Sequence, residues 1–212
     1  MVAAPIIYNT LARTAHQPLP EVLSMQWNVP NSLTLLRILL IPVFVGIFYV
    51  SPETVPAHWK NLTATLVFAL AAITDWLDGY LARALNQTSA FGAFLDPVAD
   101  KLMVAAALIV LVEFGRVGAL IALIIIGREI AISALREWMA SMGDRNSVAV
   151  AWLGKFKTAA QMAAILFLLY YDSLGALDIK FIGEILIDVA AFLTLLSMAY
   201  YLKEAWPHMR AK

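Results

Sequence analysis

Residues 75–100 read DWLDGYLARALNQTSAFGAFLDPVAD. It contains two aspartate pairs, Asp75 with Asp78 and Asp96 with Asp100, spaced three and four residues apart. At these spacings each pair projects from one face of a helix. The stretches on either side are strongly apolar, and ionisable residues inside membrane segments are costly and usually functional. The stretch therefore predicts two membrane helices that bring four carboxylates together where they meet.

Four neighbouring carboxylates repel one another in a low dielectric unless cations lie between them. Hard divalent cations prefer oxygen ligands. Two such ions can hold the attacking and leaving oxygens of a phosphoryl displacement. The alternative interpretation is that these aspartates cap helix ends or pair with arginine. The sequence thus predicts either a divalent-metal site or a set of structural ion pairs.

The composition indicates a membrane protein. Hydrophobic residues make up 62% of the 212 residues and charged residues 14%, whereas soluble domains are roughly half apolar and about a quarter charged. The chain contains no cysteine, which excludes disulfides, thiolate metal sites and a cysteine nucleophile.

Six apolar stretches approach the roughly 20 residues that span a bilayer. We therefore expect an all-α membrane protein with six transmembrane helices in one domain, residues 25–212, after a cytosolic or interfacial N-terminal extension, residues 1–24. The six stretches are Leu33–Tyr49, Leu62–Leu85, Phe91–Phe114, Val117–Met139, Ala149–Tyr171 and Ile182–Leu202.

The basic residues predict the orientation, because Lys and Arg near helix ends are retained on the cytoplasmic side. If both termini are cytoplasmic, only Lys60, Arg116 and Lys180 of the 15 basic residues lie outside. The aspartate stretch then faces the cytoplasm.

The spacing D-x2-D-G-x2-A-R-x8-G-x3-D-x3-D within residues 75–100 resembles the signature of the CDP-alcohol phosphotransferase family. The resemblance implies the six-helix fold of that family and two Mg²⁺ ions, or Mn²⁺ in their place. It also implies that Asp75, Asp78 and Asp96 are metal ligands. Asp100 would both contact metal and act as the base that takes the proton of the acceptor hydroxyl.

The same resemblance implies a site for the donor, the CDP-linked lipid. Gly79 and Ala82 match small positions that let the nucleotide approach the helix, while Arg83 and Ser89 match residues that bind CDP. Close helix packing is an alternative role for the two small residues. The start of the first helix supplies two further candidates, Asn31 and Thr34. Arg37 follows a turn later. An ordinary helix start is an equal interpretation of Pro30-Asn31-Ser32.

A second set of charged residues falls in the fourth and fifth apolar stretches. Arg128 and Arg136 lie about two helical turns apart, and Lys155 and Lys157 begin the fifth stretch. A cation there needs a partner or an anionic ligand, so these four residues are candidates for binding an acceptor phosphate. Anchoring on the cytoplasmic side, or ion pairing with Glu129 and Glu137, is the alternative.

Several stretches resemble the family members that use sn-glycerol 3-phosphate as acceptor: residues 28–37, 91–101, 128–138 and 154–161. This resemblance implies transfer of the phosphatidyl group of CDP-diacylglycerol to sn-glycerol 3-phosphate, with release of CMP. It implies a homodimer in the bacterial inner membrane, and we expect no nucleic-acid partner.

Two other functions are considered. A related enzyme could use inositol phosphate, serine or phosphatidylglycerol as acceptor, which an acceptor-exchange assay distinguishes. Intramembrane carboxylates and arginines could instead form the pathway of a small ion or proton transporter. That hypothesis predicts flux across sealed vesicles without CMP release.

Overall fold

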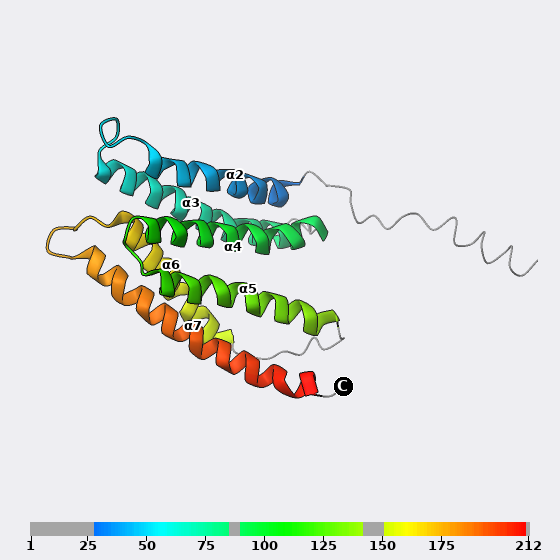
Figure 1. Cartoon of the computed structure of the whole chain (residues 1–212). Coiled ribbons are helices and arrows are strands. Elements are labelled where there is room, and N and C mark those ends of the chain that lie inside the picture. The colour runs from blue at the N-terminus through cyan, green and yellow to red at the C-terminus, as the bar shows by residue number, and fades with distance from the viewer. Residues whose placement is uncertain (1–27, 85–89, 142–150, 211–212) are drawn as a thin grey trace, which may run out of the picture.

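The structure is a computed structural model, and it describes residues 28–84, 90–141 and 151–210. Within these ranges the chain forms six α-helices and no strand (Figure 1). They are α2 (Val29–Tyr49), α3 (Ala57–Ala84), α4 (Ala90–Glu113), α5 (Ala119–Ser141), α6 (Ala151–Tyr170) and α7 (Ile179–Arg210). The all-helical class is confirmed, and a helix lies at each of the six predicted stretches; that all six cross a membrane stays a prediction. The extension, residues 1–24, lies outside the described residues.

The first helix begins earlier than its apolar run. Asn28 is the N-cap of α2, and its side chain accepts a hydrogen bond from the backbone N–H of Asn31 at 2.9 Å. Pro30 follows in the first turn, where the missing N–H costs nothing. Helix α2 therefore starts at Val29, and the interpretation of Pro30-Asn31-Ser32 as an ordinary helix start is confirmed, because these residues form its first turn. Asn31 and Thr34 both lie within α2, and their side chains are buried.

Helices α3 and α7 also extend beyond the predicted apolar stretches. Helix α3 begins at Ala57 rather than Leu62, and α7 continues to Arg210 rather than ending at Leu202. An apolar stretch marks the part of a helix suited to lipid, whereas the backbone hydrogen bonds can continue into polar sequence. The start of α3 and the end of α7 therefore lie beyond the predicted apolar stretches.

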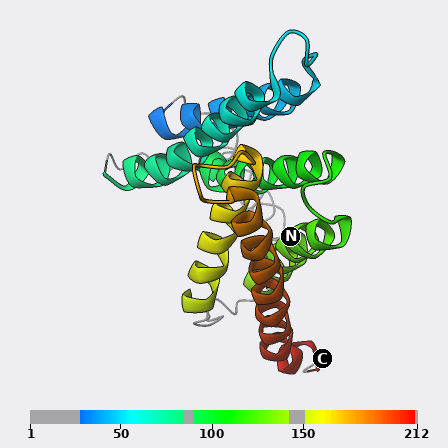
Figure 2. The ribbon, with the colours of Figure 1, turned by 90° about the vertical axis from the view of Figure 1, so that its left-hand side faces the viewer.

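The helices alternate in direction, so the site-bearing segments share one end of the bundle (Figure 1). At this end lie the beginnings of α2, α4 and α6 and the ends of α3, α5 and α7. Helix α2 packs against α3 and α4, and α7 packs against α6 and α5. In Figure 2, α2 and α3 lie across the top, α6 and α7 run downward below them, and α4 and α5 lie to the right.

A continuous apolar core joins the helices. Phe44, Phe68, Leu111, Ile125 and Leu168 are at most 1% exposed and come from five different helices. The α6–α7 contact is especially close at one position, where a Cβ added to Gly183 would lie 2.9 Å from Leu168 Cγ. Only a glycine permits this approach of the two helices.

The outer surface carries many large apolar side chains. Leu39, Leu66, Leu123 and Phe192 are each at least 60% exposed. Exposed apolar surface of this extent indicates contact with lipid or another chain. Two of the described helical segments, Pro30–Tyr49 and Ile179–Lys203, are long and apolar enough to cross a membrane.

At the end opposite the aspartates, one arginine ties three segments together. Arg116 donates to the carbonyl oxygens of Leu168 and Leu169 at 3.0 and 2.9 Å and to Asn61 Oδ1 at 2.6 Å. Its guanidinium also lies 4.3 Å from the centre of the Tyr171 ring. Burial lowers the pKa of Arg116, while Tyr171 and Asp172 oppose this shift. This cluster fixes the α4–α5 connection against α3 and α6.

Candidate active site

The predicted site begins with a buried arginine between two of the aspartates. Arg37 is 1% exposed, and its Nη1 lies 2.7 Å from Asp75 Oδ1. Its Nη2 donates to Asp78 Oδ2, and Asp78 is also buried. Since Asp75 and Asp78 lie on one face of α3 and Arg37 on α2, this ion-pair set fixes α2 against α3. The alternative interpretation, in which aspartates pair with arginine, is therefore correct for this pair in the described arrangement.

The second aspartate pair lies in the first half of α4. Thr34 Oγ1 on α2 donates to Asp96 Oδ1 at 2.5 Å, which joins the beginning of α2 to α4. Asp100 lies one turn further along α4 and is exposed. It is within electrostatic range of Asp75, Arg37 and Glu129. The exposed carboxylate of Asp100 can thus reach a ligand, and the charges that act on it include Asp75 of α3 and Glu129 of α5.

The donor atoms of the aspartates suit a hard divalent cation, because all are carboxylate oxygens. Asp75 and Asp78 already share one buried positive charge, that of Arg37. Within the described residues, however, no three His, Cys, Asp or Glu side chains are arranged to hold a metal ion. The donor set fits the metal by its chemistry, but the assignment of Asp75, Asp78, Asp96 and Asp100 as metal ligands stays a prediction.

A second charged cluster lies between α5, α6 and α7. Lys157 on α6 donates to Glu129 Oε1, and Arg128 Nη1 lies 3.4 Å from the same oxygen. Arg128 Nη2 donates to Ser197 on α7 at 3.2 Å, and its guanidinium lies 5.6 Å from the centre of the Tyr201 ring. Arg128 and Lys157 are thus brought together, and both are ion-paired with Glu129 as the alternative interpretation expected.

The structure does not describe the side chains of several predicted site residues. Ser89 falls in the undescribed range 85–89. The backbone is helical at five other predicted site positions, whose side chains lie outside the description: Gly79, Ala82, Arg83, Arg136 and Lys155. Their proposed contacts with donor or acceptor stay predictions.

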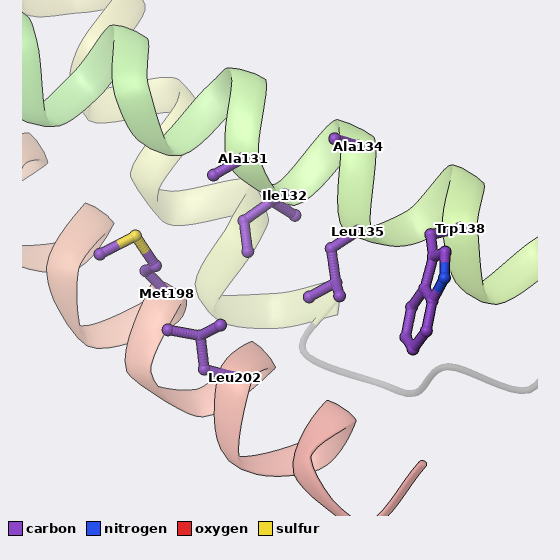
Figure 3. A pocket seen from close by; sticks show the side chains of 7 residues that line it. All are labelled: Ala131, Ile132, Ala134, Leu135, Trp138, Met198 and Leu202. Carbon is purple, nitrogen blue, oxygen red and sulfur yellow. The ribbon is translucent and has the colours of Figure 1, made fainter. Parts of the chain in front are cut away.

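An apolar cavity of about 460 Å³ lies between α5 and α7 (Figure 3). Its lining comprises Ala131, Ile132, Ala134, Leu135, Trp138, Met198 and Leu202. Figure 3 shows the α5 side chains above those of α7, with the Trp138 indole at one end. This lining suits hydrocarbon rather than a charged ligand, so the cavity is not the site of phosphoryl chemistry.

Comparison with known proteins decides the family. The model of the CDP-alcohol phosphatidyltransferase family matches residues 27–199. The chain belongs to this family. The match covers all four aspartates, Arg37 and both residues of the basic pair, Arg128 and Lys157.

Curated members of the CDP-alcohol phosphatidyltransferase family are similar over most of this chain. A protein of Shigella flexneri serotype 5b and one of Escherichia coli K12 are each 50% identical to it over 183 residues. The aligned region covers 85% of this chain and 96% of each relative. Both relatives are named CDP-diacylglycerol–glycerol-3-phosphate 3-phosphatidyltransferase.

Two contacts of the family site were missed from sequence. Arg128 donates a hydrogen bond to Ser197, which is 69 residues away in the chain, and Thr34 donates one to Asp96, which is 62 residues away. Neither partner could be assigned from sequence because hydroxyl residues are common in apolar helices. The pairing of Arg37 had a signal, because an arginine in an apolar helix needs a counter-charge.

Proposed function

We propose that this protein transfers the phosphatidyl group of CDP-diacylglycerol to sn-glycerol 3-phosphate, forming phosphatidylglycerol phosphate and CMP. One observation carries the proposal. Relatives named CDP-diacylglycerol–glycerol-3-phosphate 3-phosphatidyltransferase are 50% identical to this chain in an alignment that covers 96% of their length. The buried basic cluster of α5 and α6 supports the phosphorylated acceptor, because serine has no phosphate and its single carboxylate is balanced by its own ammonium group.

Arg128 and Lys157 would bind the acceptor phosphate. Lys157 lies within electrostatic range of Asp100. A phosphate held on the basic pair therefore places the rest of a three-carbon acceptor toward the exposed carboxylate of Asp100. This arrangement orients the free primary hydroxyl before reaction, which removes much of the entropic cost of bringing the two reactants together.

Asp75, Asp78, Asp96 and Asp100 would hold two Mg²⁺ ions, or Mn²⁺. When bound, these ions neutralise the pyrophosphate of the donor and the charge that develops on the leaving CMP. Arg37 supplies positive charge from the other side of Asp75 and Asp78. Asn31, Thr34, Gly79, Ala82, Arg83 and Ser89 would bind the CDP part of the donor.

Asp100 would act as the general base. Its carboxylate takes the proton of the primary hydroxyl, and the resulting oxygen attacks the β-phosphorus of CDP-diacylglycerol. A new phosphorus–oxygen bond forms while the anhydride bond to the α-phosphate breaks, and CMP leaves with the electron pair. No nucleophilic side chain of the protein is needed.

The proposal includes a location. All six helices would cross the bacterial inner membrane, with both termini and the aspartates on the cytoplasmic side and the chain forming a homodimer. The exposed apolar side chains support contact with lipid, and the end of α3 and the start of α4, which carry the aspartates, share one bundle end. Exposed segments can be labelled from each side of sealed vesicles, and the mass in detergent tests the dimer.

The acceptor is tested with purified protein, CDP-diacylglycerol and magnesium. CMP release is measured with sn-glycerol 3-phosphate, inositol phosphate, serine or phosphatidylglycerol as the only acceptor. The proposal predicts rapid release with glycerol 3-phosphate alone. Faster release with another acceptor would assign the chain to a different reaction of the family, and ion flux without CMP release would support a transporter.

A further inference from the structure

We propose that Glu129 is an internal counter-anion that competes with the acceptor phosphate for Arg128 and Lys157, and thereby sets the affinity for the acceptor. This inference rests on the proposed function and adds a specificity-determining residue to it. Glu129 would occupy the basic pair before the acceptor arrives and move away when the phosphate binds.

The first observation is that two cations share one carboxylate oxygen. Lys157 Nζ and Arg128 Nη1 both pair with Glu129 Oε1, the arginine at 3.4 Å. One carboxylate neutralises only one of the two positive charges, so the cluster keeps a net charge of about +1. The 3.4 Å contact is also longer than an ordinary N–H···O bond, so Arg128 is incompletely satisfied by Glu129.

The second observation is a difference in burial. The side chains of Lys157 and Arg128 are 2% and 8% exposed, whereas that of Glu129 is 26% exposed. Nε of Arg128 is buried and has no hydrogen-bond partner among the described residues. The cations are therefore enclosed by the protein, whereas the Glu129 side chain is the most exposed of the three. Glu129 is the partner that can leave.

The third observation concerns the ligand. A phosphate carries more negative charge than a carboxylate and offers several acceptor oxygens, which suits a guanidinium with unused donors. Exchange of Glu129 for phosphate would improve the pairing of Arg128 and Lys157. Its cost is the separation of Glu129 from both cations, so the affinity for the acceptor is lower than the basic pair alone would give.

A positioning role for Glu129 makes the opposite prediction. If Glu129 served only to hold Lys157 in place, its removal would weaken acceptor binding. Removal in a protein that already lacks Lys157 would then have little effect. The two roles can therefore be separated by changing the residues singly and together.

The experiment compares the wild-type enzyme with E129Q, K157Q and the double variant E129Q/K157Q. KM and kcat for sn-glycerol 3-phosphate are measured from CMP release, and the thermal shift caused by sn-glycerol 3-phosphate is measured in detergent. E184Q is the matched control, because Glu184 forms an exposed pair with Lys180 in the first turns of α7, at the opposite bundle end.

We expect E129Q to lower KM by about fivefold to tenfold, as loss of one nearby charge predicts. The E129Q substitution should lower KM by a similar factor in the K157Q background. The thermal shift caused by sn-glycerol 3-phosphate should be larger in E129Q than in the wild type, and larger in E129Q/K157Q than in K157Q. E184Q should leave KM unchanged. A higher KM in E129Q, or no effect in the K157Q background, would overturn the inference while leaving the proposed reaction intact. Failure of the wild-type protein to release CMP with this acceptor would overturn the proposed reaction itself. If E129Q does not fold, E129A and its double variant with K157Q provide the same comparison.

Discussion

Arg37 and Asp78, 41 residues apart in the chain, form a buried ion pair between α2 and α3. Asp75 shares the same guanidinium at 2.7 Å. The arrangement places a fixed positive charge behind two of the four aspartates. It also means that the stability of the α2–α3 contact depends on the residues proposed for catalysis.

Loss of this buried charge should destabilise the fold. Arg37→Gln leaves Asp78 buried without its counter-charge, and we expect a loss of about 3–5 kcal/mol in the free energy of unfolding. The measurement is thermal or denaturant unfolding of the detergent-solubilised protein. Lys180→Gln is the control, since it breaks an exposed pair with Glu184 and should change stability little. Equal effects of the two substitutions would show that the Arg37 pairs contribute no more than a surface contact.

The base should be needed for turnover but not for donor binding. Asp100→Asn keeps the size of the side chain and removes its ability to accept a proton, so kcat should fall by about 100-fold to 10,000-fold. Binding of CDP-diacylglycerol, followed by its thermal stabilisation of the protein, should persist. Asp188→Asn, beside the pocket that Arg116 lines at the opposite bundle end, is the control for changing an α-helical aspartate. Loss of donor binding in Asp100→Asn would contradict the role of a base.

The acceptor site makes a separate kinetic prediction. Lys157→Ala removes one charged donor to the acceptor phosphate, which is worth about 1.5–3 kcal/mol, or roughly 10-fold to 100-fold in KM for glycerol 3-phosphate. The effect on kcat should be smaller, and donor binding should stay. Steady-state CMP release at varied acceptor concentration measures both constants. A fall in kcat at unchanged KM would place Lys157 in the chemical step instead.

Close packing of α6 and α7 can be tested with two glycines. Gly183→Ala would push a methyl group against Leu168, and overpacking of this kind costs about 1–3 kcal/mol. A Cβ at Gly46 meets nothing within 4 Å, so Gly46→Ala should be neutral or stabilising through its higher helix propensity. Thermal unfolding of the two variants compares them directly. The account of the interface is wrong if Gly183→Ala proves as stable as Gly46→Ala.

Much of the architecture could be predicted from apolar stretches, because a bilayer demands a minimum helix length. The ends of α3 and α7 could not, since their polar residues continue the backbone hydrogen bonds beyond the apolar part. The capping of α2 by Asn28 was missed because Pro30 and Ser32 give an equally good start signal.

The family was predictable from the sequence, whereas several contacts of the candidate site residues were not. The spacing of the aspartates identified the family, and the family model confirms that identification. The partners depend on tertiary packing: Thr34 reaches Asp96 only because α2 packs against α4, and Ser197 reaches Arg128 only because α7 packs against α5. No local pattern records these pairings.

In the proposed reaction, the aspartates of α3 and α4 act with divalent cations to transfer the phosphatidyl group. The direct measurement is CMP release from CDP-diacylglycerol and glycerol 3-phosphate by the purified protein after exhaustive chelation, followed by addition of excess Mg²⁺. The account predicts that release stops with chelator and returns with Mg²⁺, and that no return occurs in Asp75→Asn. Undiminished release in the complete absence of divalent cations would contradict it.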